Sequence, residues 1–319
     1  MLSAMNAKAQ KKDYPKGKAF GTIFFNFHSE INNPVNQSEM EINRVYFGYK
    51  YDYNKFYRAY VKFDIADPVD FTDTSLVRRH IYVKNAGFRY MKDKLTFNVG
   101  IIDIFMFTVQ EKYWGHRYIN KSFLDRFKFG NKADIGTNIS WQFNKRLSVD
   151  FGIYNGEGYK KIQFDNTYKA GLGITAYPFK KLVIRLYGDY SKKTIAEYSG
   201  AVFLGYKYKD KAVIGAEYNY LGNHGFELNH NQFGYSVFGT VNLGSKWQYF
   251  ARYDCLNSNT LQGEQSPWHI HKDGNAVTTG FQYQIIKGIK VSVNYQDWIK
   301  HEQGSDDLRY LFFNLEVKF

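Results

Sequence analysis

One segment of this chain, residues 104–131, carries side chains that could bind an anion. Its charged candidates are Arg117, Lys121, Arg126, Lys128, Glu111 and Asp125. An arginine can donate two hydrogen bonds to a phosphate or carboxylate, whereas a lysine acts as a point charge. The segment is also too rich in aromatic residues for a solvated loop. We therefore expect it to pack against another part of the protein and to hold its cations there.

Other kinds of site have less support. His269 and His271 lie in a polar stretch and are candidate metal ligands, but they lack a fixed third ligand. The single cysteine, Cys255, excludes an intrachain disulfide framework and a cysteine cluster for zinc. No serine stands in the strand–turn–helix motif of serine hydrolases. We therefore predict that the protein is not an enzyme and that it has no cofactor.

Charge and composition exclude two further classes. The formal net charge is +13, but Lys and Arg are spread along the chain without the basic tract of a nucleic-acid-binding protein, so we expect no nucleic-acid partner. No run of about 18 apolar residues occurs, which excludes a membrane-spanning helix. Aromatic residues make up 19% of the chain and there are only five prolines, which favours β-strands.

Sixteen segments have a strand-like pattern, and most are ten to twelve residues long. Their approximate spans are 18–28, 42–53, 55–65, 81–91, 94–103, 132–143, 146–155, 167–178, 181–190, 199–208, 211–221, 232–243, 246–256, 275–286, 289–299 and 308–319. A tilted strand needs roughly 9–11 residues to cross the hydrocarbon layer. Most connections alternate between very short turns, as at Asp93, and long polar stretches, as at 257–274. This alternation predicts an all-β fold, a 16-stranded antiparallel transmembrane β-barrel with short periplasmic turns and long extracellular loops.

Apolar and polar residues alternate along these segments, as in the apolar row Leu182, Ile184 and Leu186. Sixteen strands enclose too wide an interior for side chains to fill, so the apolar face must contact lipid and the polar face must line the lumen. Twelve basic and seven acidic residues fall on the lumen side, an excess that attracts anions. The predicted pore wall comprises Arg44, Arg58, Lys62, Arg89, Arg185 and Arg252. The first four come from three consecutive strands, where we expect one basic patch.

Two stretches resemble known proteins. The terminal strand 311–319 alternates apolar and mostly polar residues and ends on Phe319, so it resembles the last strand of Gram-negative outer-membrane barrels, whose final Phe is part of the assembly signal. Residues 111–125, followed by Ala133-Asp-Ile-Gly136, resemble a segment of the phosphate-selective porin O/P-like group. That resemblance implies a sixteen-stranded pore, often trimeric, with an inward third loop. Its phosphate-binding residues do not align one by one with this chain, so phosphate selectivity is not carried over.

These features together predict a general or mildly anion-selective porin of the bacterial outer membrane, which lets small hydrophilic solutes diffuse passively and is constricted by the loop 104–131. The alternative is a non-conducting barrel subunit of an outer-membrane secretion or assembly complex. The expected partners are outer-membrane lipid and lipopolysaccharide, the barrel assembly machinery, small anions or polar solutes, and a possible homotrimer or larger membrane assembly.

The beginning of the chain differs from the rest. Residues 1–10 contain Ala7-Lys8-Ala9, which has the small-x-small form of a signal-peptidase site. We expect this part to be the remnant of an export signal, or alternatively a disordered N-terminus. Residues 11–319 are then expected to form a single barrel domain.

Overall fold

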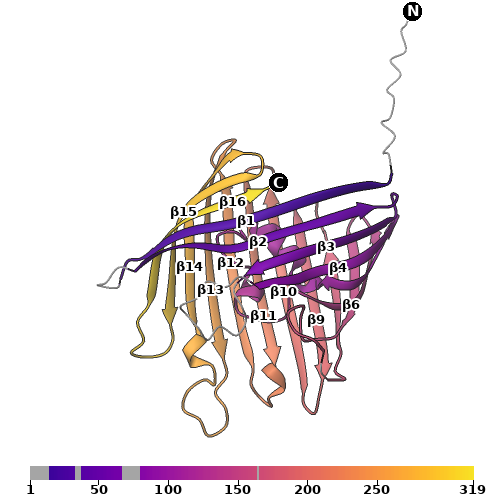
Figure 1. Cartoon of the computed structure of the whole chain (residues 1–319). Coiled ribbons are helices and arrows are strands. Elements are labelled where there is room, and N and C mark those ends of the chain that lie inside the picture. The colour runs from indigo at the N-terminus through magenta and orange to yellow at the C-terminus, as the bar shows by residue number, and fades with distance from the viewer. Residues whose placement is uncertain (1–13, 33–36, 67–79, 164) are drawn as a thin grey trace, which may run out of the picture.

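Sixteen antiparallel strands form one closed barrel in the computed structural model, which describes residues 14–32, 37–66, 80–163 and 165–319 (Figure 1). The strands are β1 (Lys16–Glu30), β2 (Ser38–Asp52), β3 (Tyr57–Ala66), β4 (His80–Lys92), β5 (Leu95–Asp103), β6 (Ala133–Asn144), β7 (Leu147–Tyr154), β8 (Lys169–Ala176), β9 (Leu182–Lys192), β10 (Ala196–Tyr208), β11 (Ala212–Gly222), β12 (Gln232–Asn242), β13 (Trp247–Ser258), β14 (Gly274–Ile286), β15 (Ile289–Lys300) and β16 (Leu308–Lys318). The predicted fold class is confirmed. Most strand ends lie within three residues of the predicted spans, and β2 begins earlier, at Ser38 instead of 42.

The period-two pattern of the strands separates two environments. Apolar side chains such as Leu186, Val202 and Leu204 are exposed on the outer surface, where a bilayer would cover them. The residues between them, such as Arg185 and Asp189, point inward and are buried. The predicted assignment of the apolar face to the outside is therefore confirmed.

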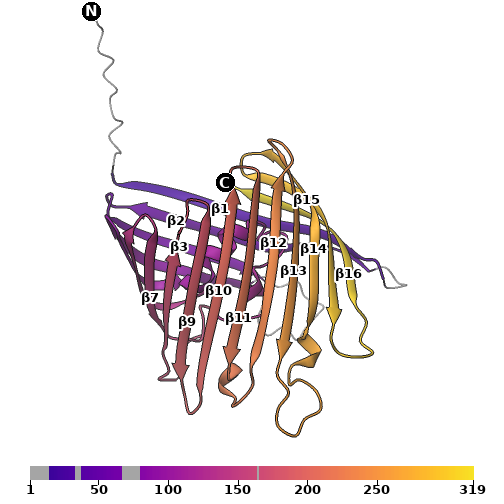
Figure 2. The ribbon, with the colours of Figure 1, turned by 180° about the vertical axis from the view of Figure 1, so that it is seen from behind.

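The connections differ in length between the two ends of the barrel (Figure 2). Strands β4 and β5 join through two residues, and so do β14 and β15, where Gly288 has φ 93°, a conformation that favours glycine. Longer connections at the opposite end include 155–168, 223–231 and 259–273. Among the connections at that end that the structure describes in full, 193–195, between β9 and β10, is the shortest. With an even number of strands, β1 begins and β16 ends at the short-turn end.

The first and last strands close the barrel. They pair from Thr22↔Lys318 to Glu30↔Tyr310, and Gly21 and Phe319 exchange backbone hydrogen bonds of 3.0 and 3.2 Å. Closure leaves no free strand edge, as a bilayer requires. Among the described residues, no helix is both long and apolar enough to span a membrane.

The connection between β5 and β6 enters the barrel. It contains the 3₁₀ helix η1 (Phe105–Phe107) and the helices α1 (Thr108–Trp114) and α2 (Phe123–Arg126), which lie within the ring of strands (Figure 1). The two buried apolar clusters of the described residues form where this connection meets the inner wall. Phe123 and Phe129 belong to one cluster, and Trp114 packs with Phe238 and Phe250 in the other. One side of the wide interior is thus filled by the protein's own loop.

The predictions for residues 1–10 lie outside the described residues, so an export-signal remnant at the start of the chain stays a prediction. The single domain 11–319 also stays a prediction.

Candidate pore and its lining residues

Buried arginines of the barrel wall hold the loop 104–131 in place. Arg185 of β9 donates to the Phe105 carbonyl at 3.0 Å and forms an ion pair with Asp150 at 2.7 Å. On the opposite side of the loop, Arg252 of β13 donates to the Lys121 carbonyl at 2.5 Å. Because both guanidinium groups are used in these contacts, they fix the loop at two separate places.

A carboxylate of the wall completes the second anchor. Asp254 accepts two hydrogen bonds of 2.7 Å from Arg252 and lies 3.5 Å from Arg126 of α2. Arg185 and Arg252 are only 1% and 3% exposed. Both were expected on the pore wall, and the structure places them beneath the loop instead, where they pair with acids. Arg126 is engaged in the same way and does not provide a free cation.

The tip of the loop is fixed by a neutral histidine. His116 lies 3.2 Å from the Gln282 amide oxygen and 2.9 Å from the Thr240 hydroxyl, and Tyr118 donates to the same Gln282 oxygen at 3.0 Å. Burial, and then the positive charge of Lys290, lower the pKa of His116 to about 3. The imidazole is therefore uncharged at neutral pH.

Two cavities lie beside the loop and share three cationic lining residues. The larger, about 540 Å³, adjoins the connection 156–161, and the smaller, about 250 Å³, reaches Lys62 and Lys318. The shared residues are Lys84 of β4, Arg117 of the loop, and Lys132 between the loop and β6. We call these three residues the junction. The larger cavity is lined by nine Lys or Arg and three Asp or Glu, and the smaller by five and two, so both are cationic.

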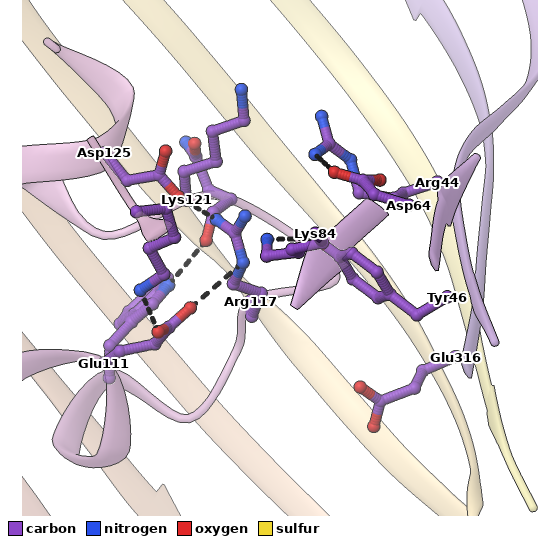
Figure 3. Close-up of polar contacts among 12 residues, drawn as sticks. Arg44, Tyr46, Asp64, Lys84, Glu111, Arg117, Lys121, Asp125 and Glu316 are labelled. Atoms are coloured by element: carbon purple, nitrogen blue, oxygen red, sulfur yellow. Dashed lines mark hydrogen bonds and ion pairs between the residues drawn. The ribbon is translucent and has the colours of Figure 1, made fainter. Parts of the chain in front are cut away.

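Two junction cations are balanced by carboxylates of the loop (Figure 3). Arg117 lies 3.0 Å from Glu111 and 2.6 Å from Asp125, and Lys132 also pairs with Glu111. Burial by itself would raise the pKa of Asp125, but Arg117 and then Lys132 outweigh it and hold that pKa below its ordinary value. The loop therefore carries a network of paired charges among the residues that line both cavities.

The third junction cation has a different environment. Lys84 forms no ion pair with a carboxylate in the described part of the chain. Its amino group lies 3.4 Å from the Tyr46 hydroxyl, 4.8 Å from the Tyr46 ring centre and 5.3 Å from that of Tyr159. Lys62 also faces the Tyr46 ring, at 4.4 Å, and likewise has no carboxylate partner among the described residues. Lys84 and Lys62 thus contribute positive charge that no ion pair neutralises, although Asp103 lines the same smaller cavity.

The predicted basic patch of β2, β3 and β4 is divided in the structure. Arg44 pairs with Asp64 at 2.9 Å and lines the larger cavity, and Lys62 lines the smaller one. Arg58 instead pairs with Asp52 near the short turn, and Arg89 donates to Asn98 at 2.6 Å. Neither Arg58 nor Arg89 lines either cavity. The patch is therefore not one continuous surface.

The remaining predicted residues are also placed. Lys121 and Lys128 line the larger cavity with Asp125. His269 stacks on Trp268 at 4.5 Å, and His271 pairs with Glu302 at 2.6 Å. No group of three or more His, Cys, Asp or Glu suited to a metal ion occurs in the residues that the structure describes. The two histidines are therefore not brought together with a third ligand.

Sequence reasoning missed Lys84 because of a β-bulge. The pairing of β3 with β4 shifts between Lys62 and Phe63, so Lys62 pairs with Asn85 while Phe63 pairs with Val83. Lys84 is the extra residue. A strict period of two that places Arg89 inside would place Lys84 outside, and nothing in the residue pattern marks the shift. Lys132 was missed for another reason, since it lies at the boundary between the loop and β6.

A closed sixteen-stranded barrel with an apolar outer surface and an inserted loop is the fold of bacterial outer-membrane β-barrels. The chain is similar in fold to three solved structures at low sequence identity. Salmonella typhi OmpF in complex with daunomycin has a TM-score of 0.69 at 12% identity, with 96% of this chain and 98% of that one covered. The anion-selective porin from Comamonas acidovorans has a TM-score of 0.69 at 10% identity, with 96% and 100% covered.

The third structure is the trimer form of in-vitro folded OmpT from Vibrio cholerae, with a TM-score of 0.61 at 13% identity and coverages of 96% and 100%. No protein-family model and no curated protein matches the sequence. At these identities the similarity shows the fold and leaves the function to be argued from the lumen.

Proposed function

We propose that this protein is a passive outer-membrane pore for small hydrophilic solutes, with a mild preference for anions and a constriction at the junction of Lys84, Arg117 and Lys132. The observation that carries the proposal is that two cationic cavities beside the inserted loop share these three residues. A solute that passes from one cavity to the other would pass these charges.

The expected preference is mild because most of the charge is paired. Arg117 and Lys132 are balanced by Glu111 and Asp125, so Lys84 is the junction residue that adds uncancelled charge. Screening reduces the effect of a charge beyond about 8 Å at physiological salt, so only charges close to the path act on an ion. We therefore propose weak selection by charge, not a site that retains one anion.

The narrower resemblance to the phosphate-selective group stays a prediction, and the paired arginines of the loop do not favour it. A homotrimer is also proposed, on the ground that a barrel of this fold, Vibrio cholerae OmpT, has a trimer form. We further propose passive diffusion instead of catalysis, because the charged groups along the cavities are arranged as ion pairs and fixed cations.

Planar-bilayer recording tests this function. Purified protein should open channels with a linear current–voltage relation, and the zero-current potential in a KCl gradient should show a mild preference for chloride. Bilayers that stay silent although folded barrels have inserted would contradict the proposal and favour the alternative of a non-conducting subunit. A preference for potassium would contradict the anion selectivity alone.

A further inference from the structure

A separate cavity of about 390 Å³ lies between the end of α2 and the long-loop ends of β15 and β16. Four aromatic residues line it, with Trp298, Tyr310 and Phe312 on the inner barrel face and Phe127 on the loop. All four side chains are partly exposed. A volume of this size falls in the range of about 300–1,000 Å³ that is usual for small-molecule pockets.

This aromatic surface is unusual for its position. Further along the same strands, the inner face is polar and satisfied, as where Asn294 donates to Asn314 at 2.6 Å. Apolar surface left in contact with water costs roughly 25 cal/mol per Å², so an aromatic wall in a hydrated lumen is unfavourable unless something covers it. The cavity therefore has the composition of a binding site more than that of a pore wall.

The rings are held in defined positions. Phe127 and Trp298 have centroids 5.5 Å apart at an interplanar angle of 33°, and the Arg126 guanidinium lies 5.4 Å from the Trp298 ring centre. Tyr310 and Phe312 have centroids 5.8 Å apart. Such an arrangement presents aromatic faces and edges to a flat ring, which prefers offset or edge-to-face contact.

The polar groups of the cavity narrow the class of ligand. Gln296 donates to Asn294 at 3.0 Å, and His271 is paired with Glu302. Asp297 also lines the cavity, but it accepts a hydrogen bond from Tyr295 at 2.9 Å and lies 3.6 Å from Arg309. Few hydrogen-bonding groups therefore remain for the many hydroxyl groups of a sugar. Lys272 has no carboxylate partner among the described residues, so it could pair with an anionic group on a ring.

We propose that this cavity is a binding subsite for aromatic anions, in which Trp298, Tyr310 and Phe312 contact the ring and Lys272 attracts the anionic group. The proposal rests on the pore function, because the subsite would then concentrate aromatic acids at the long-loop mouth of the pore.

The test measures binding and conduction separately. The binding of 1-naphthoate and of acetate to the protein in lipid nanodiscs is measured by calorimetry, with empty nanodiscs subtracted. We expect saturable binding of 1-naphthoate and none of acetate. In planar bilayers, 1-naphthoate should also reduce the chloride current at concentrations where acetate does not.

Two variants locate the site. Trp298→Leu and Tyr310→Leu should each raise the Kd for 1-naphthoate by roughly two- to tenfold, the range expected for the loss of one aromatic contact. Tyr310 is included because Trp298 also packs on the loop, and each variant is first checked for a folded barrel by circular dichroism. Tyr206→Leu, which removes a ring from the outer face, is the matched control and should bind like the wild type.

An equal Kd in all three variants and the wild type would overturn the subsite. Equal binding of acetate and 1-naphthoate would do the same. If 1-naphthoate binds but the bilayers conduct no ions, the subsite stands and the pore function fails, so the two failures are distinguishable.

Discussion

Removal of the two lysine charges at the junction and next to it that have no ion-pair partner should change ion selectivity more than removal of any paired charge. The variant is Lys62→Met with Lys84→Met, which keeps side-chain length while it deletes two positive charges. Both amino groups face the Tyr46 ring, at 4.4 and 4.8 Å, and neither has a carboxylate partner in the described residues. No new unpaired acid is therefore created.

The magnitude follows from Coulomb's law. A unit charge stabilises an anion 4 Å away by about 1 kcal/mol in water, and the salt of the recording buffer reduces this by about half. Two lysines then contribute about 1 kcal/mol, which corresponds to about a fivefold change in the partition of chloride. The partition of potassium into the pore changes in the opposite direction by a similar factor. Because the two changes multiply, the permeability ratio of chloride to potassium should fall by up to about 25-fold.

The assay is the zero-current potential in a tenfold KCl gradient. The double variant should shift it toward the potassium equilibrium potential, while the control Lys94→Met, which removes one charge from an exposed short turn, should leave it in place. If the double variant and the control have the same zero-current potential as the wild type, the two lysines do not face the ion path and the reasoning fails.

Three further perturbations test the loop and the barrel seam. Asp254→Ala leaves the buried guanidinium group of Arg252 and the partly exposed one of Arg126 without their acid, so it should destabilise the docked loop by about 3–5 kcal/mol and raise single-channel current noise. The pKa of His116 is about 3 when docked and about 6.5 when released, so the released loop binds a proton more readily. Docking is thus most stable above pH 6.5 and weakens as the pH falls toward 3, by about 2 kcal/mol at pH 5, and current noise should rise with acid in the wild type but not in His116→Gln. Deletion of Phe319 removes the backbone pairing with Gly21 that ends the β1–β16 seam, and it should lower the yield of heat-resistant folded barrel in outer-membrane fractions.

The barrel could be predicted because its signals are local and repeated. Each strand carries its own alternation, and each short turn marks one end of the molecule. The rows Leu182, Ile184, Leu186 and Val202, Leu204 kept their predicted outward direction because a shift of one residue would bury every apolar side chain in the lumen.

The lining of the lumen was less predictable because it depends on distant contacts. A residue's inward direction does not reveal whether the loop covers it, and Arg185 and Arg252 are both inward and covered. The partner of each cation comes from elsewhere in the chain: Arg126 finds Asp254, 128 residues away. Lys84 was hidden by a bulge that leaves no mark in the residue pattern.

Whether a lumen cation forms an ion pair depends on whether a carboxylate lies close to it. Arg185 and Arg252 lie in buried contacts beneath the loop, where an unpaired charge would be too costly, so each has a carboxylate partner. Arg126 of the loop shares the carboxylate of Asp254. Lys84 and Lys62 contact cavities and tyrosine rings, where water and the ring faces can stabilise an ammonium group without an acid. The buried arginines therefore hold the loop in place, and in the proposed function the lysines left beside the cavities would favour the passage of anions. A lysine in place of Arg252 should not hold the loop, because it cannot make the forked contact of Arg252 with Asp254 and a loop carbonyl.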